Sequence, residues 1–249
     1  MLALVLAGTA EENDLTRLAG VKNKSFINLG GKTALAYILK TLEMTEAISR
    51  IIVVGPEESL MGLKKEFDFE IVPEEGSITR NIYAPYRRGL MQGPFLLVTG
   101  DIPLLTVEAL EDFLQQCSPY DLDFYYPIIP KEAIERSYPA TKRTYVPLKE
   151  GVFTGGNIFV VRAEKIEKSL PQVEDFIRLR KSFIKMMSKL GVAFILKYIS
   201  RRLVIEDLVK QCKVLFDVEA KAVITWYPEI GTDMDKASDL AFFQQQLGG

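Results

Sequence analysis

Histidine is absent from this chain of 249 residues, and cysteine is nearly so. Without imidazole, the sequence excludes Ser-His-Asp and Cys-His nucleophile activation and every zinc site that needs a histidine ligand. The two cysteines, Cys117 and Cys212, lie far apart and outside any CxxC pattern, which argues against a disulfide framework or a thiolate metal site. Any chemistry must therefore use carboxylates, lysines, arginines, backbone amides and a hard cation.

Long apolar runs are also missing. No window approaches the roughly 18 uninterrupted apolar residues of a membrane span. The apolar N-terminus has no basic flank and ends after about seven residues, short of a secretory signal. We therefore expect a cytoplasmic protein with no transmembrane segment, and the 48% of apolar residues suffices for a sizeable core.

Charge is low overall but unevenly distributed. The net charge is −2, yet residues 162–213 contain thirteen Lys and Arg against six Asp and Glu. Apolar residues recur there at spacings of three and four, which predicts basic amphipathic helices. We interpret 163–213 as a basic helical insertion that contacts an anionic acceptor, a second subunit of a homodimer or a lipid-phosphate surface. Dimerisation or a substrate lid ranks above peripheral membrane contact, and no nucleic-acid partner is expected.

Apolar runs alternate with helical patterns along the first half of the chain. Strands are predicted at 2–8, 51–54, 69–72 and 95–99, and helices at 33–44, 57–66, 77–91 and 106–116. Thr33, Ser77 and Thr106 are suited to cap three of these helices. The alternation predicts an α/β fold with a doubly wound, mostly parallel sheet in a single domain, residues 1–249. Later strands are predicted at 122–128, 158–161 and 222–226, and a closing helix at 236–247.

A lone acid follows the apolar strand at 95–99. Gly100 lets the backbone turn, and Asp101 then emerges at the carboxyl end of the strand, where open α/β sheets bind their ligands. Capping of the next helix would be the alternative role, but Thr106 is better placed for it. Because hard cations prefer carboxylates, Asp101 is the first candidate for a metal ligand.

The stretch LALVLAGTAEENDLTRLAGVKNKSFINLGGKTALAYIL carries the chain's most specific motifs. These are, in order, Leu6-Ala7-Gly8, Arg17, Lys24 with Phe26, and Gly30-Gly31-Lys32. In order and rough spacing they resemble the MobA-like nucleotidyltransferases, named for molybdenum cofactor guanylyltransferase and related to the sugar-phosphate and isoprenoid-alcohol nucleotidyltransferases. The resemblance implies a sheet of the nucleotide-diphospho-sugar transferase (GT-A-like) type.

The same resemblance assigns nucleotide-binding and catalytic roles. Backbone amides can cradle a triphosphate at Leu6, Ala7, Gly8 and Thr9. Lys24 and Arg17 would be the catalytic cations, because they can offset charge that develops on the α-phosphate. Thr9 replaces a glycine of the family pattern and three acids follow it, so a solvated surface loop is the alternative interpretation.

Two further segments supply the implied metal site. Asp101, in a G-D-x-P context, resembles the family's metal-binding and nucleotide-contacting Asp. PEIGTDMDKASDL, residues 228–240, resembles the D-x-D-T-P-E-D-L ending of several relatives. In an extended segment Asp233 and Asp235 point the same way, so both can approach one Mg²⁺. We favour Asp235 as ligand, with Asp233 beside it and Asp239 in the first turn of a helix; two capping acids are the alternative.

The predicted contacts with the acceptor and with the nucleotide base depend on shorter motifs. Gly155-Gly156-Asn157 resembles the G-x-x-N that closes on the acceptor in related enzymes. The glycines permit close backbone approach, and the asparagine offers both a donor and an acceptor. A tight turn before a strand explains these residues equally well. Arg80 and Asn81 occupy the place where relatives contact the base or ribose.

The sequence thus predicts a Mg²⁺-dependent nucleotidyltransferase. It would move a nucleotidyl group from an NTP to a small phosphate-bearing or alcohol acceptor and release pyrophosphate. A GT-A glycosyltransferase with Asp233-Met234-Asp235 as its D-x-D stays open, although the C-terminal position of that motif speaks against it. The altered glycine loop also leaves open a nucleotide-binding or scaffold protein without turnover.

Overall fold

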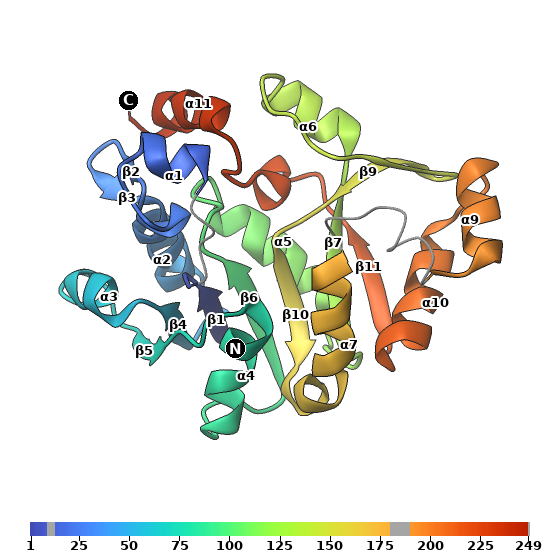
Figure 1. Ribbon diagram of the computed structural model, residues 1–249, viewed down its shortest axis with the longest axis horizontal. Helices are drawn as coiled ribbons and strands as arrows, with labels where there is room; N and C mark the ends of the chain where they lie inside the picture. The colour runs from blue at the N-terminus through green and yellow to red at the C-terminus, as the bar shows by residue number, and fades with distance from the viewer. Residues whose placement is uncertain (9–12, 180–189, 249) are drawn as a thin grey trace.

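The fold is built on a nine-stranded sheet. The computed structural model describes residues 1–8, 13–179 and 190–248. The strands lie in the order β5-β4-β1-β6-β10-β7-β9-β8, with β11 beside β7 (Figure 1). Their bounds are β1 Leu2–Leu6, β4 Arg50–Gly55, β5 Glu70–Pro73, β6 Pro94–Thr99, β7 Phe124–Pro130, β8 Val146–Leu148, β9 Gly151–Gly155, β10 Ile158–Arg162 and β11 Ala220–Ile224.

Strand direction divides the sheet into two parts. β5, β4, β1 and β6 are parallel to one another, as the strand–helix alternation predicts. β10 is antiparallel to both β6 and β7, and β7, β9 and β8 form a further antiparallel series. β11 returns parallel to β7. The predicted α/β class with a doubly wound sheet is confirmed.

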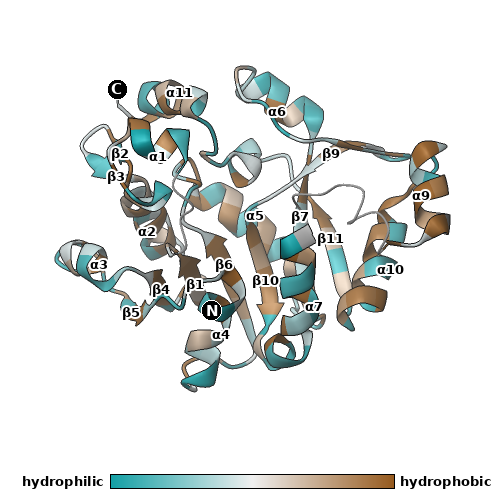
Figure 2. Cartoon of the chain, in the orientation of Figure 1, coloured by the Kyte–Doolittle hydropathy of each residue, from teal (hydrophilic) through white to brown (hydrophobic). Residues whose placement is uncertain are grey.

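Helices cover both faces of the parallel part. In chain order, the described helices are α1 Asp14–Leu18, α2 Ala34–Met44, α3 Glu57–Leu63, α4 Ile78–Arg87, α5 Val107–Cys117, α6 Lys131–Ser137, α7 Ile166–Leu179, α9 Val192–Ile199, α10 Ile205–Phe216 and α11 Ala237–Leu247. Alternate residues of β1 point to opposite faces. Ala3 and Val5 pack with α2 and α5, whereas Leu4 packs in the cluster that includes α4 and α7. Figure 2 shows apolar strands at the centre of the sheet and helices of mixed character, with α9 the most apolar among them.

Three predicted helix caps are confirmed. The hydroxyls of Thr33, Ser77 and Thr106 accept hydrogen bonds from the backbone N–H groups of the first turns of α2, α4 and α5. The prediction that the helix beginning at Ser77 would reach residue 91 was too long. α4 ends at Arg87, shortly before Gly89, whose φ of +70° lies in the left-handed region that terminates helices.

The second half differs from the prediction in two places. β9 was not predicted as a strand, although it pairs with both β7 and β8. Residues 163–213, predicted to be helical throughout, contain α7, α9 and α10 with a break at 200–204. Residues 180–189 of that prediction lie outside the described residues. Among the helices that the structure describes, none combines the length and apolar character needed to cross a membrane.

Candidate active site

The carboxyl ends of β1 and β6 meet at one edge of the sheet, and Gly100 makes this approach possible. Its N–H donates to the carbonyl oxygen of Leu6 at 2.9 Å. A Cβ atom at residue 100 would lie 2.3 Å from Ser25 Oγ and 2.8 Å from the Leu6 oxygen, so no larger residue fits without movement of the backbone. The turn after Gly100 brings Asp101 to this edge.

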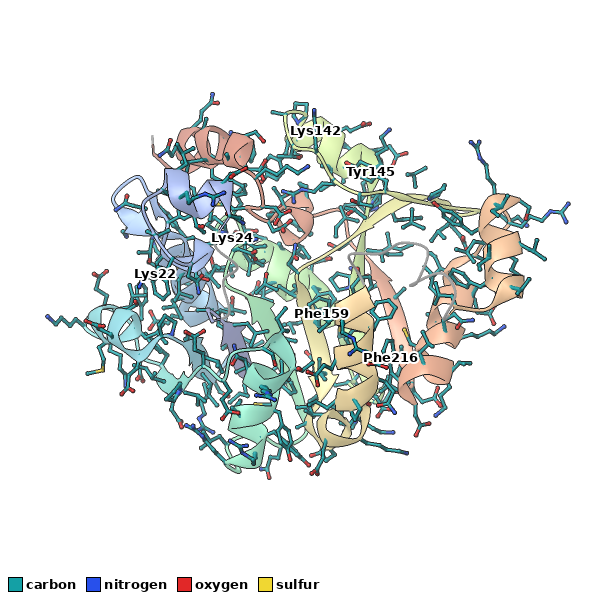
Figure 3. The ribbon with its side chains drawn as sticks, viewed as in Figure 1. Lys22, Lys24, Lys142, Tyr145, Phe159 and Phe216 are labelled. Carbon is teal, nitrogen blue, oxygen red and sulfur yellow. The ribbon has the colours of Figure 1, made fainter. Side chains whose placement is uncertain are left out.

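Lys24 reaches the same edge from a short 3₁₀ helix, η1 (Lys24–Phe26). Asn23 fixes η1 against the end of β1, because its Oδ1 accepts from Ser25 N–H at 2.9 Å and its Nδ2 donates to the Ala7 oxygen at 2.6 Å. Lys24 Nζ then lies 3.0 Å from Asp101 Oδ2 and 3.1 Å from Asp235 Oδ1 (Figure 3). Three segments far apart in the sequence therefore converge on one ammonium group.

Burial by itself would lower the pKa of Lys24, but the nearby carboxylates of Asp101 and Asp235 outweigh burial and raise it. Lys24 is therefore a cation at neutral pH. Its charge neutralises part of the negative charge of the carboxylates.

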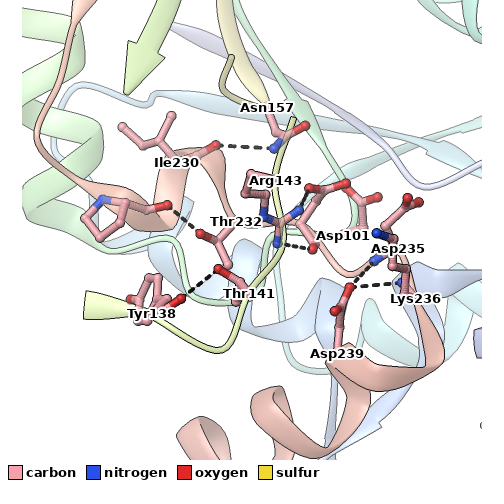
Figure 4. Close-up of polar contacts among 12 residues, drawn as sticks. Asp101, Tyr138, Thr141, Arg143, Asn157, Ile230, Thr232, Asp235, Lys236 and Asp239 are labelled. Carbon is pink, nitrogen blue, oxygen red and sulfur yellow. Dashed lines mark hydrogen bonds and ion pairs between the residues drawn. The ribbon is translucent and has the colours of Figure 1, made fainter. Parts of the chain in front are cut away.

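The segment before α11 supplies the other acids of the site. Met234 N–H donates to the Asp101 carbonyl oxygen at 2.9 Å, and the Met234 side chain is fully buried. Asp233 and Asp235 therefore flank a residue that fixes the segment in place. Asp239 accepts hydrogen bonds from the backbone N–H groups of Asp235 and Lys236 at 3.0 and 2.9 Å (Figure 4), which makes it the first-turn helix acid that the sequence predicts.

Arg143 is a site residue that sequence reasoning missed. Its Nη1 pairs with Asp233 Oδ1, and its Nη2 donates to the Asp233 carbonyl oxygen at 2.6 Å (Figure 4). Burial, together with the negative charge of Asp101, raises the pKa of Asp233 to about 6, although Arg143 and Lys24 oppose the shift. No motif around residue 143 signals this role, because its partner lies 90 residues away.

Four buried side-chain polar atoms have no hydrogen-bond partner in the described part of the chain: Asn81 Nδ2, Thr99 Oγ1, Asp101 Oδ1 and Arg143 Nε. Buried polar groups are nearly always paired in folded proteins. Thr99 ends β6, and Asp101 follows it. Asn81 Nδ2 lies 2.9 Å from where a Cβ of Gly8 would be, beside the end of β1. These atoms therefore mark positions where a ligand would supply the missing partners.

The predicted nucleotide-binding residues are only partly placed by the structure. Leu6, Ala7 and Gly8 lie at the end of β1, whereas Thr9 lies outside the described residues. Arg80 is exposed in the first turn of α4, and its contact with a base stays a prediction.

Arg17 is on α1, where it forms an exposed ion pair with Asp14 at 2.5 Å. The structure brings Lys24 to Asp101 and Asp235 but shows no contact of Arg17 with them. The catalytic role of Arg17 stays a prediction.

The space beside each glycine of the pair before β10 is occupied by other side chains of the protein. A Cβ at Gly155 would lie 1.6 Å from the Tyr126 hydroxyl oxygen, and one at Gly156 would lie 2.7 Å from Ile230. Asn157 connects two segments of the site, because its N–H donates to the Ile230 oxygen at 2.9 Å and its carbonyl accepts from Thr99 N–H at 3.1 Å. Internal packing thus accounts for both glycines, and their contact with an acceptor stays a prediction.

The three predicted metal ligands lie in one region but are paired with cations. Asp101 and Asp235 share Lys24, and Asp233 pairs with Arg143. Within residues 1–8, 13–179 and 190–248, no group of three or more His, Cys, Asp or Glu side chains is arranged to hold a metal ion. Asp101 Oδ1, however, is buried without a partner, and such an oxygen suits a hard cation.

The doubly wound sheet carries acids and a half-buried lysine at its carboxyl edge, the place where open α/β sheets bind their ligands. Residues 3–172 match the model of the MobA-like NTP transferase domain, and the chain belongs to this family. The resemblance seen in the sequence is thereby confirmed, and the protein is a nucleotidyltransferase. The chain matches no curated protein sequence.

Solved structures share this fold. A hypothetical transferase from Thermus thermophilus is 33% identical over 96% of this chain and 98% of its own, with a TM-score of 0.84. CMP:2-keto-3-deoxy-manno-octonic acid synthetase, complexed with CTP, shares the fold at 11% identity and a TM-score of 0.60 over 98% of this chain and 97% of its own. The 4-diphosphocytidyl-2C-methyl-D-erythritol synthase of Anaerococcus prevotii shares the fold at 14% identity and a TM-score of 0.57, over 99% of this chain and 95% of its own.

Proposed function

We propose that this protein transfers a nucleotidyl group from an NTP to a small acceptor that carries a phosphate or an alcohol, with release of pyrophosphate. The observation that supports this most is the convergence of Lys24, Asp101 and Asp235 within 3.0–3.1 Å at the carboxyl edge of the sheet. Nucleotidyl transfer needs a cation at the reacting phosphate and carboxylates that hold a metal ion, and this cluster contains both.

In the proposed reaction, an acceptor oxygen attacks the α-phosphorus of the NTP in line with the leaving group. The bond from that phosphorus to the bridging oxygen breaks, and pyrophosphate leaves with the electron pair. An alcohol acceptor loses its proton to solvent. Lys24 stabilises the negative charge that develops on the α-phosphate oxygens, and its raised pKa keeps it charged for this role.

Asp101 and Asp235 are the residues that would hold Mg²⁺. The unpartnered Asp101 Oδ1 fits this role. When bound, the cation neutralises phosphate charge as pyrophosphate departs. In the nucleotide-free protein the ammonium of Lys24 neutralises the same carboxylates, and arrival of a metal nucleotide would leave Lys24 available to the phosphates.

The nucleotide would lie over the end of β1. The side chains of Glu74 and Asn81 pack against Gly8 there, and the unpartnered Nδ2 of Asn81 offers a donor to the base or ribose. CTP is the first candidate, because one relative of this fold was solved with CTP and another is named for a diphosphocytidyl product.

The test is pyrophosphate release with each of the four NTPs, CTP first, against a panel of phosphate-bearing and alcohol acceptors at saturating Mg²⁺. We expect one NTP and acceptor pair to turn over, and Asp101→Ala to lower its rate at least about 100-fold. Asp68→Asn is the control that should keep full activity, because Asp68 is exposed and is not one of the candidate site residues.

Full activity of Asp101→Ala would contradict this assignment, as would the absence of pyrophosphate release with every NTP and acceptor tested. Binding of an NTP without pyrophosphate release would instead identify a nucleotide-binding protein.

A further inference from the structure

We propose that Arg143 binds an oxyanion of the acceptor, a phosphate or a carboxylate. This inference rests on the proposed nucleotidyl transfer and names the acceptor class for it. Arg143 would then be a substrate-binding residue, and its contact with Asp233 would be the ligand-free arrangement of the acceptor subsite.

The first argument is the hydrogen bonding of the guanidinium group. The Arg143 side chain is only 8% exposed, and two of its nitrogens are directed at Asp233. Its Nε is buried and has no partner within the described residues. A guanidinium carries five N–H donors in a rigid plane, and a buried donor without an acceptor is costly. An oxyanion that binds here would supply the acceptor that Nε lacks.

The second argument is position. Lys24, Gly8 and Asn81 lie on the side of the site formed by β1 and its neighbours. Arg143 lies between α6 and β8, in the part of the sheet beyond β10. In the view of Figure 4 it lies between Asp101 and the contact of Asn157 with Ile230. Through Asp233, Arg143 lies beside the segment whose Met234 N–H donates to the Asp101 carbonyl oxygen, and we assign the acceptor to this side of Asp101.

The third argument is that the segment around Arg143 is built into the fold. The N–H and hydroxyl of Thr141 both donate to the Tyr138 carbonyl oxygen, at 3.0 and 2.8 Å. The Tyr138 ring packs edge-on against Phe242 of α11. These contacts fix the backbone just before Arg143, and the pair with Asp233 fixes its guanidinium, so less freedom is lost when a ligand binds.

The fourth argument is charge. The charges of three aspartates, Asp101, Asp233 and Asp235, are partly offset by Lys24 and Arg143. Lys24 is committed to the α-phosphate in the proposed reaction, so a second oxyanion would need a cation of its own. Asp233 presents one carboxylate oxygen, Oδ1, and its backbone carbonyl oxygen to the guanidinium, and a phosphate or carboxylate ligand could offer two oxygens in the same way. Asp233 would then compete with the acceptor for Arg143.

That competition separates a binding role from a merely structural one. If Arg143 only clamps the segment before α11, Asp233→Asn weakens the clamp and has no effect on anion binding through Arg143. If Arg143 is the acceptor cation, the same substitution frees it, and anions bind more tightly.

The experiment titrates inorganic phosphate and, separately, acetate into the full-length protein by calorimetry, without any NTP. We expect one of these anions to bind Asp233→Asn about tenfold more tightly than wild type. We expect Arg143→Gln to abolish that gain in the double variant. Asp235→Asn is the matched control, since it removes a nearby negative charge that pairs with Lys24 and not with Arg143. Any change that it causes in anion affinity should persist when Arg143→Gln is also present.

If Arg143→Gln does not fold, Arg143→Lys replaces it, because lysine keeps the positive charge. This variant should retain only part of the increase in anion affinity caused by Asp233→Asn, because lysine lacks the planar set of guanidinium donors. The inference is overturned if Asp233→Asn binds neither anion more tightly, or if its gain survives loss of Arg143. Because the titration needs no turnover, it can fail while pyrophosphate release is observed, or succeed where none is.

Discussion

At the scale of single residues, Lys24 has a proposed role in catalysis and observed contacts with two carboxylates. As a catalytic cation it must face phosphate oxygens. In the nucleotide-free protein it instead pairs with Asp101 and Asp235 at 3.0 and 3.1 Å. An ammonium that neutralises two carboxylates also competes with any metal ion for them.

Lys24→Met should therefore change metal affinity and activity in opposite directions. Without nucleotide, we expect the variant to bind Mn²⁺ about tenfold more tightly than wild type, because the competing charge is gone. Pyrophosphate release should fall at least about 100-fold. Electron paramagnetic resonance of free Mn²⁺ measures the first effect. Lys22→Met, which removes an exposed charge two residues away (Figure 3), is the control. Unchanged or weaker Mn²⁺ binding by Lys24→Met would rule out the competition.

Cys117 gives a prediction for alkaline pH. Burial raises the pKa of this thiol from its ordinary value of 9.0 to about 12. The thiolate therefore forms first in the unfolded chain, so the stability that this thiol contributes is complete below pH 9 and is lost as the pH rises toward 12. Between pH 8 and 10 we expect the wild-type advantage over Cys117→Ala to shrink by about 1.4 kcal/mol in urea unfolding. A constant difference would mean that the thiol ionises equally in both states.

At the scale of elements, what the sequence predicted well was local. Thr33, Ser77 and Thr106 cap the helices that follow them, because a cap needs only a hydroxyl and an N–H group three residues on. β9 was missed because two glycines bound a five-residue strand, and its pairing with β7 and β8 is not visible in its own composition.

Thr106 links one of these elements to the active site. Besides capping α5, its hydroxyl donates to Glu229 Oε1 at 3.0 Å, and Glu229 is a buried acid in the segment that leads to Asp233. Thr106→Ala should therefore cost about 2–3 kcal/mol, the cap plus a lost donor to a buried carboxylate. Thr33→Ala, which removes only a cap, should cost about 1 kcal/mol. Urea unfolding of both variants and of Thr106→Ser, which should retain most stability, checks this. Equal losses for the two alanine variants would contradict the role of Glu229.

In the folded chain, basic residues of the segment 162–213 pair with acids that lie outside it. Arg162 and Lys165 pair with Asp123, and Lys168 pairs with Asp217, which lies just beyond the segment. Acids outside the segment thus offset part of its charge. A count along the sequence could not show this, because Asp123 belongs to the turn before β7. Contact of this segment with a partner remains a proposal.

At the scale of the whole molecule, the site could be predicted wherever its residues carry a motif of their own. Lys24, Asp101 and Asp235 were each chosen from a short pattern, and the fold brings them together. Arg143 has no such pattern, since its environment is made by a segment 90 residues away. Pairings of this kind depend on tertiary structure, which local spacing does not encode.

The last helix, α11, packs against segments from the first forty residues of the chain. α11 lies beside α1 and the hairpin of β2 (Asn28–Leu29) and β3 (Lys32–Thr33), at the upper left of Figure 1. The Tyr37 hydroxyl donates to the Leu247 carbonyl oxygen at 3.2 Å. Phe243 is fully buried in one cluster with Leu15, Ile27 and Met234. The last helix therefore holds both the segment around Lys24 and the segment that carries Asp233 and Asp235.

Phe243→Ala should accordingly weaken the fold and the site together. We expect a loss of about 3–5 kcal/mol in urea unfolding, because the substitution leaves a cavity among fully buried side chains. Mn²⁺ affinity should fall as well, since Met234, the residue between the two aspartates, loses a packing partner. Phe242→Ala, at the adjacent half-buried ring, is the matched control and should cost less in both measurements. If the two variants behave alike, or if Mn²⁺ binding is unaffected while stability falls, the C-terminal helix supports the fold without positioning the site.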